Sequence, residues 1–385
     1  MNEYAQRVYS RLNELYENEK EYLQTVQAWL EMISPAIAAN SEYEKQDLLT
    51  RMVEPERMVS FLVPWQDDEG NYHTNHGYRV QFNSAIGPYK GGLRFHPSLN
   101  AGTVKFLGFE QTYKNALSGL PIGGAGGGAD FDPNGKSNRE IMRFCQSFMT
   151  SLYRYIGADI DVPAGDIGVG TREIGYLYGE YKRLAGRAES GAITGKGLTY
   201  GGSKVRQDAA GFGAVYFLAR MLEHHGDTLA GKRIVVSGFG NMALGVCRKA
   251  SELDAKVITL SGPDGYIHDA EGITTNEKFD CIMQMRASGV DKVQPYAEQF
   301  GVPFFAGKKP WDTAAEIVMP CAIENEIDSK DASVILENGT KYYVEAANMP
   351  ATYDALQLLR MDPRIHCAGS KAAGSGGVIV SALEM

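Results

Sequence analysis

Two lysines and a glutamine in the first third of the chain could bind a small anion. Lys90 lies in segment 86–97, which is rich in glycine and turn-forming residues. Gln111 and Lys114 are three positions apart in a stretch of helical character, so their side chains lie one turn apart on one face of a helix. A lone lysine is usually a solvated surface charge. Two lysines and a glutamine among glycines and aromatic residues suit a substrate with two negative charges.

A run of glycines follows at positions 123–128, where only Ala125 is a different residue. Each glycine inside a helix or strand costs roughly 0.5–1 kcal/mol relative to alanine. The run therefore predicts a loop whose backbone lies close against another group. In an enzyme, that group is usually the substrate.

The second half of the chain carries a pattern typical of dinucleotide binding. A β-branched run at 234–236 precedes Gly238, Gly240 and Ala243, which have the spacing G-x-G-x-x-A. The glycines permit a tight turn and close approach of a pyrophosphate, and the alanine lets helix and strand pack closely. An ordinary strand-turn-helix corner can show the same spacing. A second strand-like run at 256–260, at the distance expected of a βαβ unit, favours a dinucleotide site.

The residues after that second strand indicate which dinucleotide is bound. An acidic residue at the end of this strand commonly binds the adenosine ribose. Here Asp264 comes three positions late, where an ordinary turn residue is an equal alternative. No arginine or lysine stands beside it to receive a 2′-phosphate, so NAD is favoured over NADP.

Helices and strands must position these groups. Residues 1 to about 55 have helical periodicity, with Leu23, Val26 and Leu30 on one apolar stripe. Alternating residues on either side of a turn-rich segment predict a hairpin over 58–82. The further elements expected are helices at 104–117, 140–155 and 211–225, a glycine-rich loop at 164–170, and strands at 317–319 and 341–344.

The length of 385 residues, with 44% hydrophobic and 22% charged residues, fits a globular protein of two or three domains. No apolar stretch approaches the roughly 18–20 residues that span a bilayer, and the first residues do not resemble a secretion signal, so we expect a cytoplasmic protein. The net charge of −9, without a basic run, argues against nucleic acid or an anionic membrane as the main partner.

Cysteines and histidines give no sign of a metal site. The five cysteines include no C-x-x-C pair, and we expect buried free thiols. The seven histidines lack spacings such as H-E-x-x-H, and the adjacent His224 and His225 would point in different directions on a helix. We therefore expect no protein-bound transition metal.

Together these segments resemble the hexameric bacterial glutamate dehydrogenases of the Glu/Leu/Phe/Val dehydrogenase family, from residue 1 to residue 385. The further motifs that carry the resemblance are Asp130–Pro133, Pro163–Gly170, Arg172–Gly175, Thr194–Gly197 and Ala347–Pro350. The resemblance implies reversible oxidative deamination of L-glutamate to 2-oxoglutarate and ammonium, with hydride transfer to NAD or NADP.

The expected fold class is α/β, with two domains. Residues 1–200 would form a mixed-sheet domain for substrate binding and oligomerisation, and residues 201–385 a Rossmann-type, doubly wound dinucleotide-binding domain. The resemblance suggests a homohexamer, although the N-terminal helices are also compatible with a dimer. It also implies several dozen residues beyond Met385 that complete the second domain in family members.

The resemblance assigns roles to substrate-binding residues. Lys90 and Ser381 would bind the side-chain carboxylate of glutamate, and Gln111 and Lys114 its α-carboxylate. Gly165 would contribute a backbone contact.

Asp166 would be the acid–base group that moves protons to and from the amino group, with a pKa tuned by partial burial and nearby lysines. A loop-capping aspartate is the plainer alternative. In the family, the glycine run carries a lysine that activates the water attacking the imine, and Gly126 stands at the matching position. The nearest lysines in the sequence are Lys114 and Lys136.

Loss of a positioned acid–base group typically removes about 10²–10⁴ in rate. We therefore expect slow or altered turnover, with binding less affected. The alternative is a paralogue that binds nucleotide or dicarboxylate, or assembles with an intact partner, without efficient turnover.

Cofactor contacts are also carried over from the resemblance. Asn241 would touch the cofactor beside the glycine turn, and Asn348 would lie near the nicotinamide ribose. Ala210 stands where the family usually has a cofactor-contacting threonine. Gly374 and Ser375 replace an asparagine-alanine pair near the nicotinamide.

Overall fold

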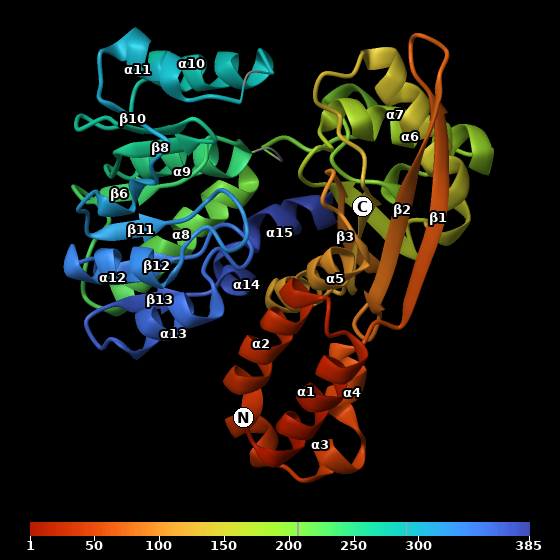
Figure 1. Ribbon diagram of the computed structural model, residues 1–385, viewed down its shortest axis with the longest axis horizontal. Coiled ribbons are helices and arrows are strands. Elements are labelled where there is room, and N and C mark those ends of the chain that lie inside the picture. The colour runs from red at the N-terminus through yellow and green to blue at the C-terminus, as the bar shows by residue number, and fades with distance from the viewer. Residues whose placement is uncertain (206–207, 290) are drawn as a thin grey trace. The chain divides into compact units, whose positions relative to one another are not determined.

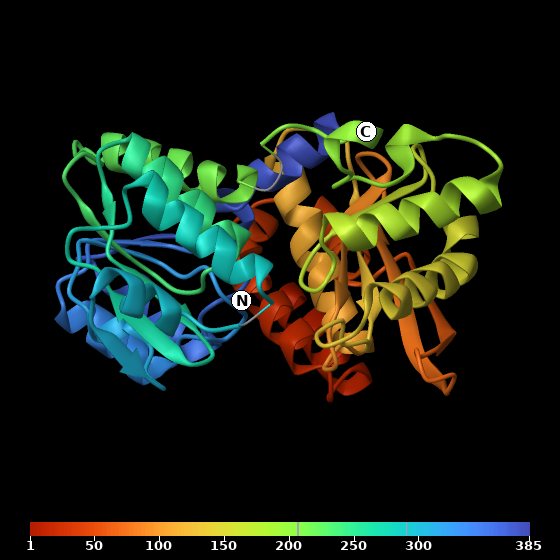
Figure 2. The same cartoon turned by 90° about the horizontal axis from the view of Figure 1, so that it is seen from above.

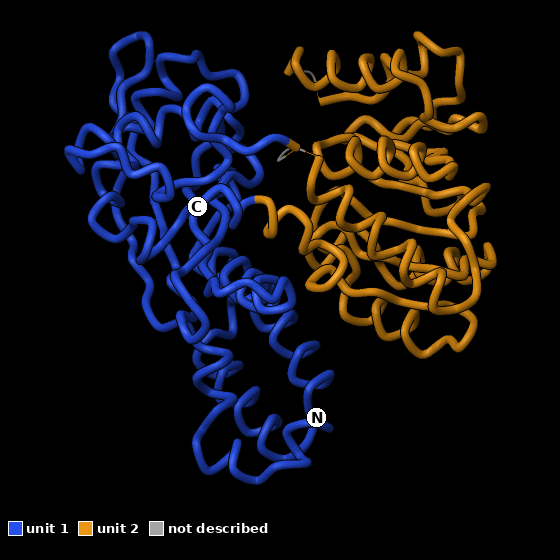
Figure 3. The backbone as a smooth tube through the Cα atoms, turned by 180° about the vertical axis from the view of Figure 1, so that it is seen from behind, with its two compact units in different colours: residues 1–204, 381–385 blue, residues 205–380 orange. Residues whose placement is uncertain are grey.

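The computed structural model of the protein (Figure 1) describes residues 1–205, 208–289 and 291–385. Contacts divide the chain into two compact units, coloured separately in Figure 3. The first unit contains residues 1–204 and 381–385, and the second contains residues 205–380. The division lies close to the predicted boundary at residue 200, but the last five residues join the first unit.

The first unit opens with helices, as predicted. These helices are α1 (Glu3–Leu15), α2 (Lys20–Ala38), α3 (Glu42–Lys45) and α4 (Leu48–Val53). The predicted stripe of Leu23, Val26 and Leu30 on α2 is buried. The ring of Trp29, on the same helix, packs edge-on against that of Phe109.

A five-stranded mixed sheet follows, in the order β1-β2-β4-β3-β5. Its strands are β1 (Arg57–Gln66), β2 (Tyr72–Asn83), β3 (Tyr89–Phe95), β4 (Gly124–Ala129) and β5 (Asp161–Gly165). The predicted hairpin is the antiparallel pair β1 and β2. Strand β4 is antiparallel to β2, whereas β3 is parallel to both β4 and β5. The turn-rich segment 86–97 thus contains a strand that the sequence did not reveal, and the predicted loop 164–170 begins inside β5.

The predicted loop at 123–128 was wrong, because these glycines form most of β4, a fully buried strand between β2 and β3. Helix α5 (Ala101–Leu117) lies directly on this strand. A Cβ atom at Gly124 would come 1.9 Å from Thr112 Oγ1, and one at Gly126 would come 2.8 Å from the backbone nitrogen of Gly108. Glycine is therefore used where strand and helix leave no room for side chains. Pairing on both edges satisfies the strand's backbone groups.

Two further helices, α6 (Asn138–Leu152) and α7 (Thr171–Ala185), lie side by side on the face of the sheet opposite α5 (Figure 2). Phe144 and Phe148 of α6 pack against Phe95 of β3 in a buried aromatic cluster. Short 3₁₀ turns complete this unit at Tyr153–Tyr155, Ser190–Ala192 and Leu198–Tyr200.

The second unit contains the expected parallel sheet, in the order β13-β12-β11-β6-β7. Its strands are β6 (Arg233–Val236), β7 (Lys256–Val257), β11 (Ile317–Met319), β12 (Tyr342–Val344) and β13 (His366–Ala368). Neighbouring residues of β6, such as Ile234 and Val235, belong to different apolar clusters, so both faces of the sheet are buried. The helices of this unit are α8 (Ala209–His224), α9 (Asn241–Glu252), α10 (Asn276–Ala287), α11 (Gln294–Phe300), α12 (Ser329–Glu337), α13 (Tyr353–Met361) and α14 (Ser370–Ala373), with a 3₁₀ turn at Pro310–Asp312.

The strand predicted at 256–260 is divided between two sheets. Its first part is β7, and its second part begins β8 (Thr259–Gly262). β8 pairs in an antiparallel three-stranded sheet with β9 (Gly265–His268), which also pairs with β10 (Phe304–Ala306). Helix α15 (Gly376–Leu383) ends the ordered elements, and its last residues belong to the first unit.

Among the helices of the described residues, none combines the length and apolarity that crossing a bilayer requires. The five cysteines are free; Cys367 is half-buried and the other four are buried. In the described parts of the chain, no three histidine, cysteine or acidic residues lie where they could hold a metal ion together.

Candidate active site

Lys90, on β3, places its ammonium group beside two buried hydroxyl groups. Its Nζ donates a hydrogen bond to Thr194 Oγ1 at 2.7 Å, and Thr194 Oγ1 lies 2.6 Å from Ser381 Oγ. All three residues are at most 3% exposed. The structure therefore brings together Lys90 and Ser381, two predicted substrate-binding residues that are far apart in the sequence. Thr194, which joins them, received no role from the sequence.

The segment that carries Thr194 is held by Glu384. The Glu384 carboxylate accepts hydrogen bonds from the backbone nitrogens of Gly195 and Lys196, each at 3.0 Å, and forms a 2.8 Å ion pair with Lys196 Nζ. The two side chains of the ion pair are 0% and 1% exposed. Ser381 lies about one helical turn before Glu384, so this ion pair fixes Ser381 against Thr194. No local spacing marks Lys196 and Glu384 as partners.

Asn115 connects the polar residues of α5 to β3 and to Gly123, the residue before β4. Gln111 Nε2 donates to Asn115 Oδ1 at 2.6 Å. Asn115 Nδ2 in turn donates to the carbonyl oxygen of Lys90 at 3.0 Å and to that of Gly123. Lys114 is buried on the same helix, 7% exposed. The predicted residues Gln111 and Lys90 are thus joined through an asparagine that sequence reasoning missed.

Asp166 follows β5 and forms an ion pair with Arg94 of β3, with 2.9 Å between Arg94 Nε and Asp166 Oδ2. The arginine side chain is 7% exposed and the aspartate side chain 31% exposed, so the carboxylate is oriented but open to solvent. The sequence analysis did not name Arg94 as a partner of Asp166, and its expectation of nearby lysines stays a prediction. Gly92 leaves room for this pair, since a Cβ there would lie 2.9 Å from Asp166 Cβ. Gly165 is equally constrained, because its Cβ would come 2.4 Å from the carbonyl oxygen of Val169.

A fully buried ion pair between Arg79 and Asp161 supports the glycines of β3. Arg79 bonds to Asp161 through Nε at 2.9 Å, and its Nη1 donates to the carbonyl oxygens of Gly91 and Gly92 at 3.2 Å. Gln81 also donates to Asp161, at 3.1 Å. This network fixes the backbone between Lys90 and Arg94, which carries both a predicted substrate ligand and the partner of Asp166.

The predicted glycine turn lies at the carboxyl end of β6 in the second unit. Gly238 has φ +74°, a left-handed conformation that favours glycine, and its N–H donates to Ser261 Oγ at 2.8 Å. A Cβ atom at Gly240 would meet nothing within 4 Å, so open space adjoins the start of α9. Asn241 is the first residue of that helix, and Ala243 is fully buried as close packing requires. A cradle of this kind fits the pyrophosphate of a dinucleotide.

The other predicted cofactor residues have more varied surroundings. The Asp264 carboxylate accepts hydrogen bonds from the backbone nitrogens of Val293, at 3.0 and 3.1 Å, and of Gln294, at 3.0 Å. It therefore holds the start of α11, which agrees with the turn-residue alternative. Ala210 lies near the start of α8, where a Cβ on Gly377 would come 3.0 Å from the alanine Cβ. Asn348 is half-buried beyond β12.

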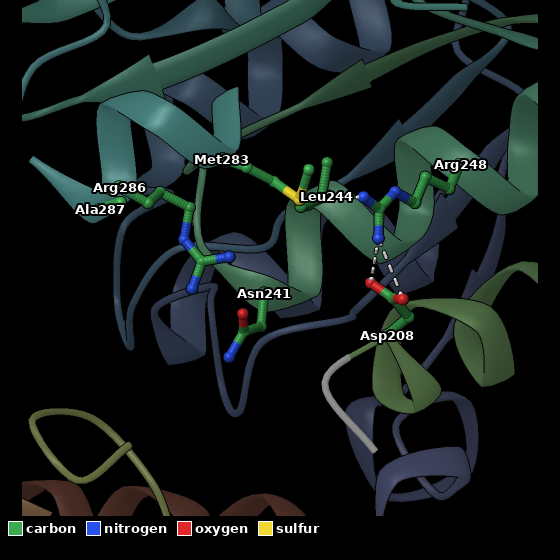
Figure 4. Close-up of a pocket in the computed structure, with 7 residues that line it drawn as sticks. All are labelled: Asp208, Asn241, Leu244, Arg248, Met283, Arg286 and Ala287. Atoms are coloured by element: carbon green, nitrogen blue, oxygen red, sulfur yellow. Dashed lines mark hydrogen bonds and ion pairs between the residues drawn. The ribbon is translucent and has the colours of Figure 1, made fainter. Parts of the chain in front are cut away.

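A cavity of about 290 Å³ lies between α9 and α10 (Figure 4), and no motif in the sequence predicted it. Its lining residues are Asp208, Asn241, Leu244, Arg248, Met283, Arg286 and Ala287. Arg248 Nη1 bonds to both carboxylate oxygens of Asp208 at 3.1 Å, while Arg286 and Asn241 point into the same space. Burial lowers the pKa of the Arg286 guanidinium. The cavity therefore adjoins the predicted cofactor residue Asn241 and offers it a cationic neighbour.

Residues 55–183 match the dimerisation domain of the Glu/Leu/Phe/Val dehydrogenases, and residues 201–385 match the Glutamate/Leucine/Phenylalanine/Valine dehydrogenase family. The chain belongs to this family. It is 56% identical over 385 residues to an NAD-specific glutamate dehydrogenase of Clostridium symbiosum, covering 100% of this chain and 86% of the relative. It is also 50% identical over 365 residues to an NADP-specific glutamate dehydrogenase of Haemophilus influenzae, covering 95% of this chain and 81% of that protein.

Solved structures agree with this membership. A structure described as glutamate dehydrogenase matches with a TM-score of 0.98 and 55% identity, covering 100% of this dehydrogenase and 85% of the other chain. The family and the α/β fold expected from the motifs are thus confirmed. The comparisons give no support to the alternative of a paralogue without turnover.

Proposed function

We infer that this dehydrogenase catalyses the reversible oxidative deamination of L-glutamate to 2-oxoglutarate and ammonium, with hydride transfer to NAD or NADP. The observation that carries this inference is similarity to glutamate dehydrogenases over all 385 residues of this chain, together with the Lys90, Thr194 and Ser381 cluster. An ammonium group with two hydroxyl groups is a suitable receptor for a carboxylate. A bound nicotinamide would supply the hydride acceptor.

The roles of the substrate residues form part of this proposal. Lys90 and Ser381 bind the side-chain carboxylate, where positive charge and hydroxyl donors converge. Gln111 and Lys114 bind the α-carboxylate from the last turns of α5. Gly165 presents its backbone beside Asp166.

Asp166 is proposed as the proton carrier. Its ion pair with Arg94 fixes the position of one carboxylate oxygen, and partial exposure leaves the group able to exchange protons with water or substrate. Gly126 supplies no amine at the position where the family lysine would activate water. We therefore expect this enzyme to be slower than relatives that carry the lysine, by a factor within about 10²–10⁴.

For the cofactor, NAD is proposed as preferred over NADP. The relatives include both NAD-specific and NADP-specific enzymes, and the NAD-specific relative from Clostridium symbiosum has the higher identity of the two described. Gly238, Gly240, Asn241 and Ala243 would hold the pyrophosphate end of the dinucleotide, and Asn348 would lie near its nicotinamide ribose. Contacts by Asp264 and Ala210 stay predictions of the sequence.

The assembly is proposed to be a homo-oligomer. The description of residues 55–183 as a dimerisation domain supports this proposal, and a homohexamer is the expected state, with a dimer as the alternative. A cytoplasmic location also stays a prediction of the sequence.

The test is NADH oxidation by the purified chain in the presence of 2-oxoglutarate and ammonium, repeated with NADPH. We expect measurable turnover that falls by about 10²–10⁴ in Asp166→Asn, whose amide keeps the shape of the carboxylate but cannot carry the proton. Other 2-oxo acids serve as the specificity control. Unchanged turnover in Asp166→Asn would contradict the proposed role of Asp166 as proton carrier. A preference for an apolar 2-oxo acid would contradict the assignment of 2-oxoglutarate as the substrate.

A further inference from the structure

Ser237 and Glu326 form a buried polar link beside the glycine turn. Ser237 is the residue between β6 and Gly238, and its side chain is fully buried. Its Oγ accepts a hydrogen bond from the backbone nitrogen of Cys321 at 2.9 Å and donates to Glu326 Oε1 at 2.9 Å. Glu326 Oε1 also accepts from the backbone nitrogen of Ala322 at 3.1 Å.

The direction of each hydrogen bond follows from the donors present. A backbone N–H can only donate, so Cys321 must use a lone pair of the Ser237 hydroxyl. The single hydroxyl proton is then free to go to Glu326, whose oxygen accepts from two donors at once. Removal of the Glu326 side chain would leave the buried Ser237 hydroxyl and the half-buried Ala322 N–H without this acceptor. A polar group that loses its hydrogen-bond partner away from water costs free energy.

The link joins the carboxyl ends of two neighbouring strands. Ser237 follows β6, and Cys321 and Ala322 follow β11, which is paired in parallel with β6. The turn itself touches the same segment, because a Cβ at Gly238 would lie 3.2 Å from both the Ala322 Cα and the Cys321 carbonyl oxygen. We therefore expect a displacement of segment 321–322 to disturb the glycine turn.

On its other side, the turn is held by β8. The Gly238 N–H donates to Ser261 Oγ at 2.8 Å, and the Gly238 carbonyl oxygen accepts from the Ser261 nitrogen at 3.3 Å. The turn thus lies between two supports, Ser261 on one side and the link through Ser237 and Glu326 on the other. Its backbone geometry depends on both.

We propose that Ser237 and Glu326 are positioning residues for the dinucleotide, which hold the turn Gly238–Gly240 in the geometry that receives the pyrophosphate. This inference rests on the proposed use of NAD or NADP. Neither residue needs to touch the cofactor, because their hydrogen bonds act on the backbone that does. Glutamine at position 326 would retain an amide oxygen for both donors, so it should replace glutamate in this role.

The chain offers a matched control at the opposite ends of the same two strands. Glu316 precedes β11, and its Oε2 accepts a 3.3 Å hydrogen bond from the backbone nitrogen of Arg233, the first residue of β6. It therefore also joins β6 to β11, but away from the turn. Glu316→Ala tests whether loosening these strands is by itself enough to weaken cofactor binding.

The experiment is a fluorescence titration with NADH of the unaltered chain and of Ser237→Ala, Glu326→Ala, Glu326→Gln and Glu316→Ala. We expect Ser237→Ala and Glu326→Ala to raise the Kd for NADH about tenfold, as the loss of one or two hydrogen bonds would. Glu326→Gln and Glu316→Ala should stay within about twofold of the unaltered chain. Calorimetric titration with 2-oxoglutarate should give the same Kd for all five proteins, because its proposed site lies in the first unit.

Unchanged NADH binding in Ser237→Ala and Glu326→Ala would overturn the inference while leaving the proposed function intact. A loss of affinity in Glu316→Ala as large as in Glu326→Ala would also overturn it, because the effect would then belong to the strands in general. An unaltered chain that binds neither NADH nor NADPH would overturn the proposed function, and this inference with it. If Glu326→Ala does not fold, the smaller change Ser237→Ala still decides the outcome.

Discussion

Gly126 of β4 and Gly108 of α5 lie so close that a Cβ atom on Gly126 would be 2.8 Å from the Gly108 backbone nitrogen. The carbonyl oxygen of Val104 and the Cβ of Leu107 would lie at 3.0 and 3.1 Å. Any side chain at position 126 therefore requires β4 or α5 to shift. This contact links the chemistry of the expected lysine position to the packing of the helix that carries Gln111 and Lys114.

Gly126→Lys should consequently have two separable effects. Gly126→Ala introduces only the Cβ atom, and we expect it to lower the free energy of unfolding by about 1–3 kcal/mol, the usual cost of overpacking. Gly126→Lys should show a similar loss of stability, but should reduce 2-oxoglutarate with ammonium at least about tenfold faster than Gly126→Ala. Urea denaturation and steady-state rates measure the two effects. A lysine variant no faster than the alanine variant would show that an amine at this position does not assist the reaction.

Thr194→Val should weaken substrate binding selectively. The substitution keeps a similar shape but removes the hydroxyl group between Lys90 Nζ and Ser381 Oγ. We expect the KM for glutamate to rise roughly five- to thirtyfold, the effect of about 1–2 kcal/mol, with the Kd for NADH unchanged. Thr194→Ser retains the hydroxyl and should stay close to the unaltered enzyme. Equal KM values for the serine and valine variants would contradict a role for the hydroxyl.

Lys196→Met should destabilise the first unit, because it leaves the carboxylate of Glu384 buried without its cation. Breaking a buried ion pair from one side costs roughly 3–5 kcal/mol, and the backbone donors of Gly195 and Lys196 should keep the loss near about 3 kcal/mol. Arg220→Met removes a pair with Glu223 whose side chains are 83% and 59% exposed, and should cost less than about 0.5 kcal/mol. Denaturant unfolding of both variants makes the comparison. Similar losses in the two would show that burial of the Lys196 pair has no energetic importance.

The parts of the fold that the sequence predicted are those determined locally. The helical stripe of Leu23, Val26 and Leu30 and the alternation over 58–82 depend on neighbours in the chain, and both predictions are confirmed. The G-x-G-x-x-A spacing also describes a single strand, turn and helix. Its placement at the carboxyl end of β6 therefore followed from the sequence.

The parts that escaped prediction depend on contacts between distant segments. Glycine is locally unfavourable in a strand, but β4 consists largely of glycine because α5 leaves no space for side chains there. Likewise, no spacing in the sequence shows that Arg94 pairs with Asp166, or that Glu384 receives the Lys196 ammonium. The identity of Lys90 and Ser381 as partners came from the resemblance, whereas Thr194 between them is visible only in the structure.

Because of Glu326, the free energy of unfolding should depend on pH between the ordinary pKa of this residue and its pKa in the folded chain. Burial raises the pKa of Glu326 from 4.5 to about 7, against the opposing effects of its hydrogen bonds and of Lys309. Cys321 and Tyr343, which also face it, stay neutral because burial raises the pKa of each well above its usual range. The folded chain thus holds this proton more tightly than the unfolded chain.

The contribution of the Glu326 carboxyl group to the free energy of unfolding is therefore fully present below pH 4.5. It is lost as the pH rises to about 7. Glu326→Gln cannot ionise, so its free energy of unfolding relative to the unaltered chain should rise across this interval, by up to about 3 kcal/mol, and stay level above it. Urea denaturation of both proteins from pH 4.5 to 8.5 measures the difference, and contributions from other groups cancel. Glu316→Gln is the matched control, because it also replaces a carboxyl group that joins β6 to β11. If the difference in free energy of unfolding between Glu326→Gln and the unaltered chain does not change with pH, the Glu326 carboxyl group ionises in the folded chain as it does in the unfolded chain.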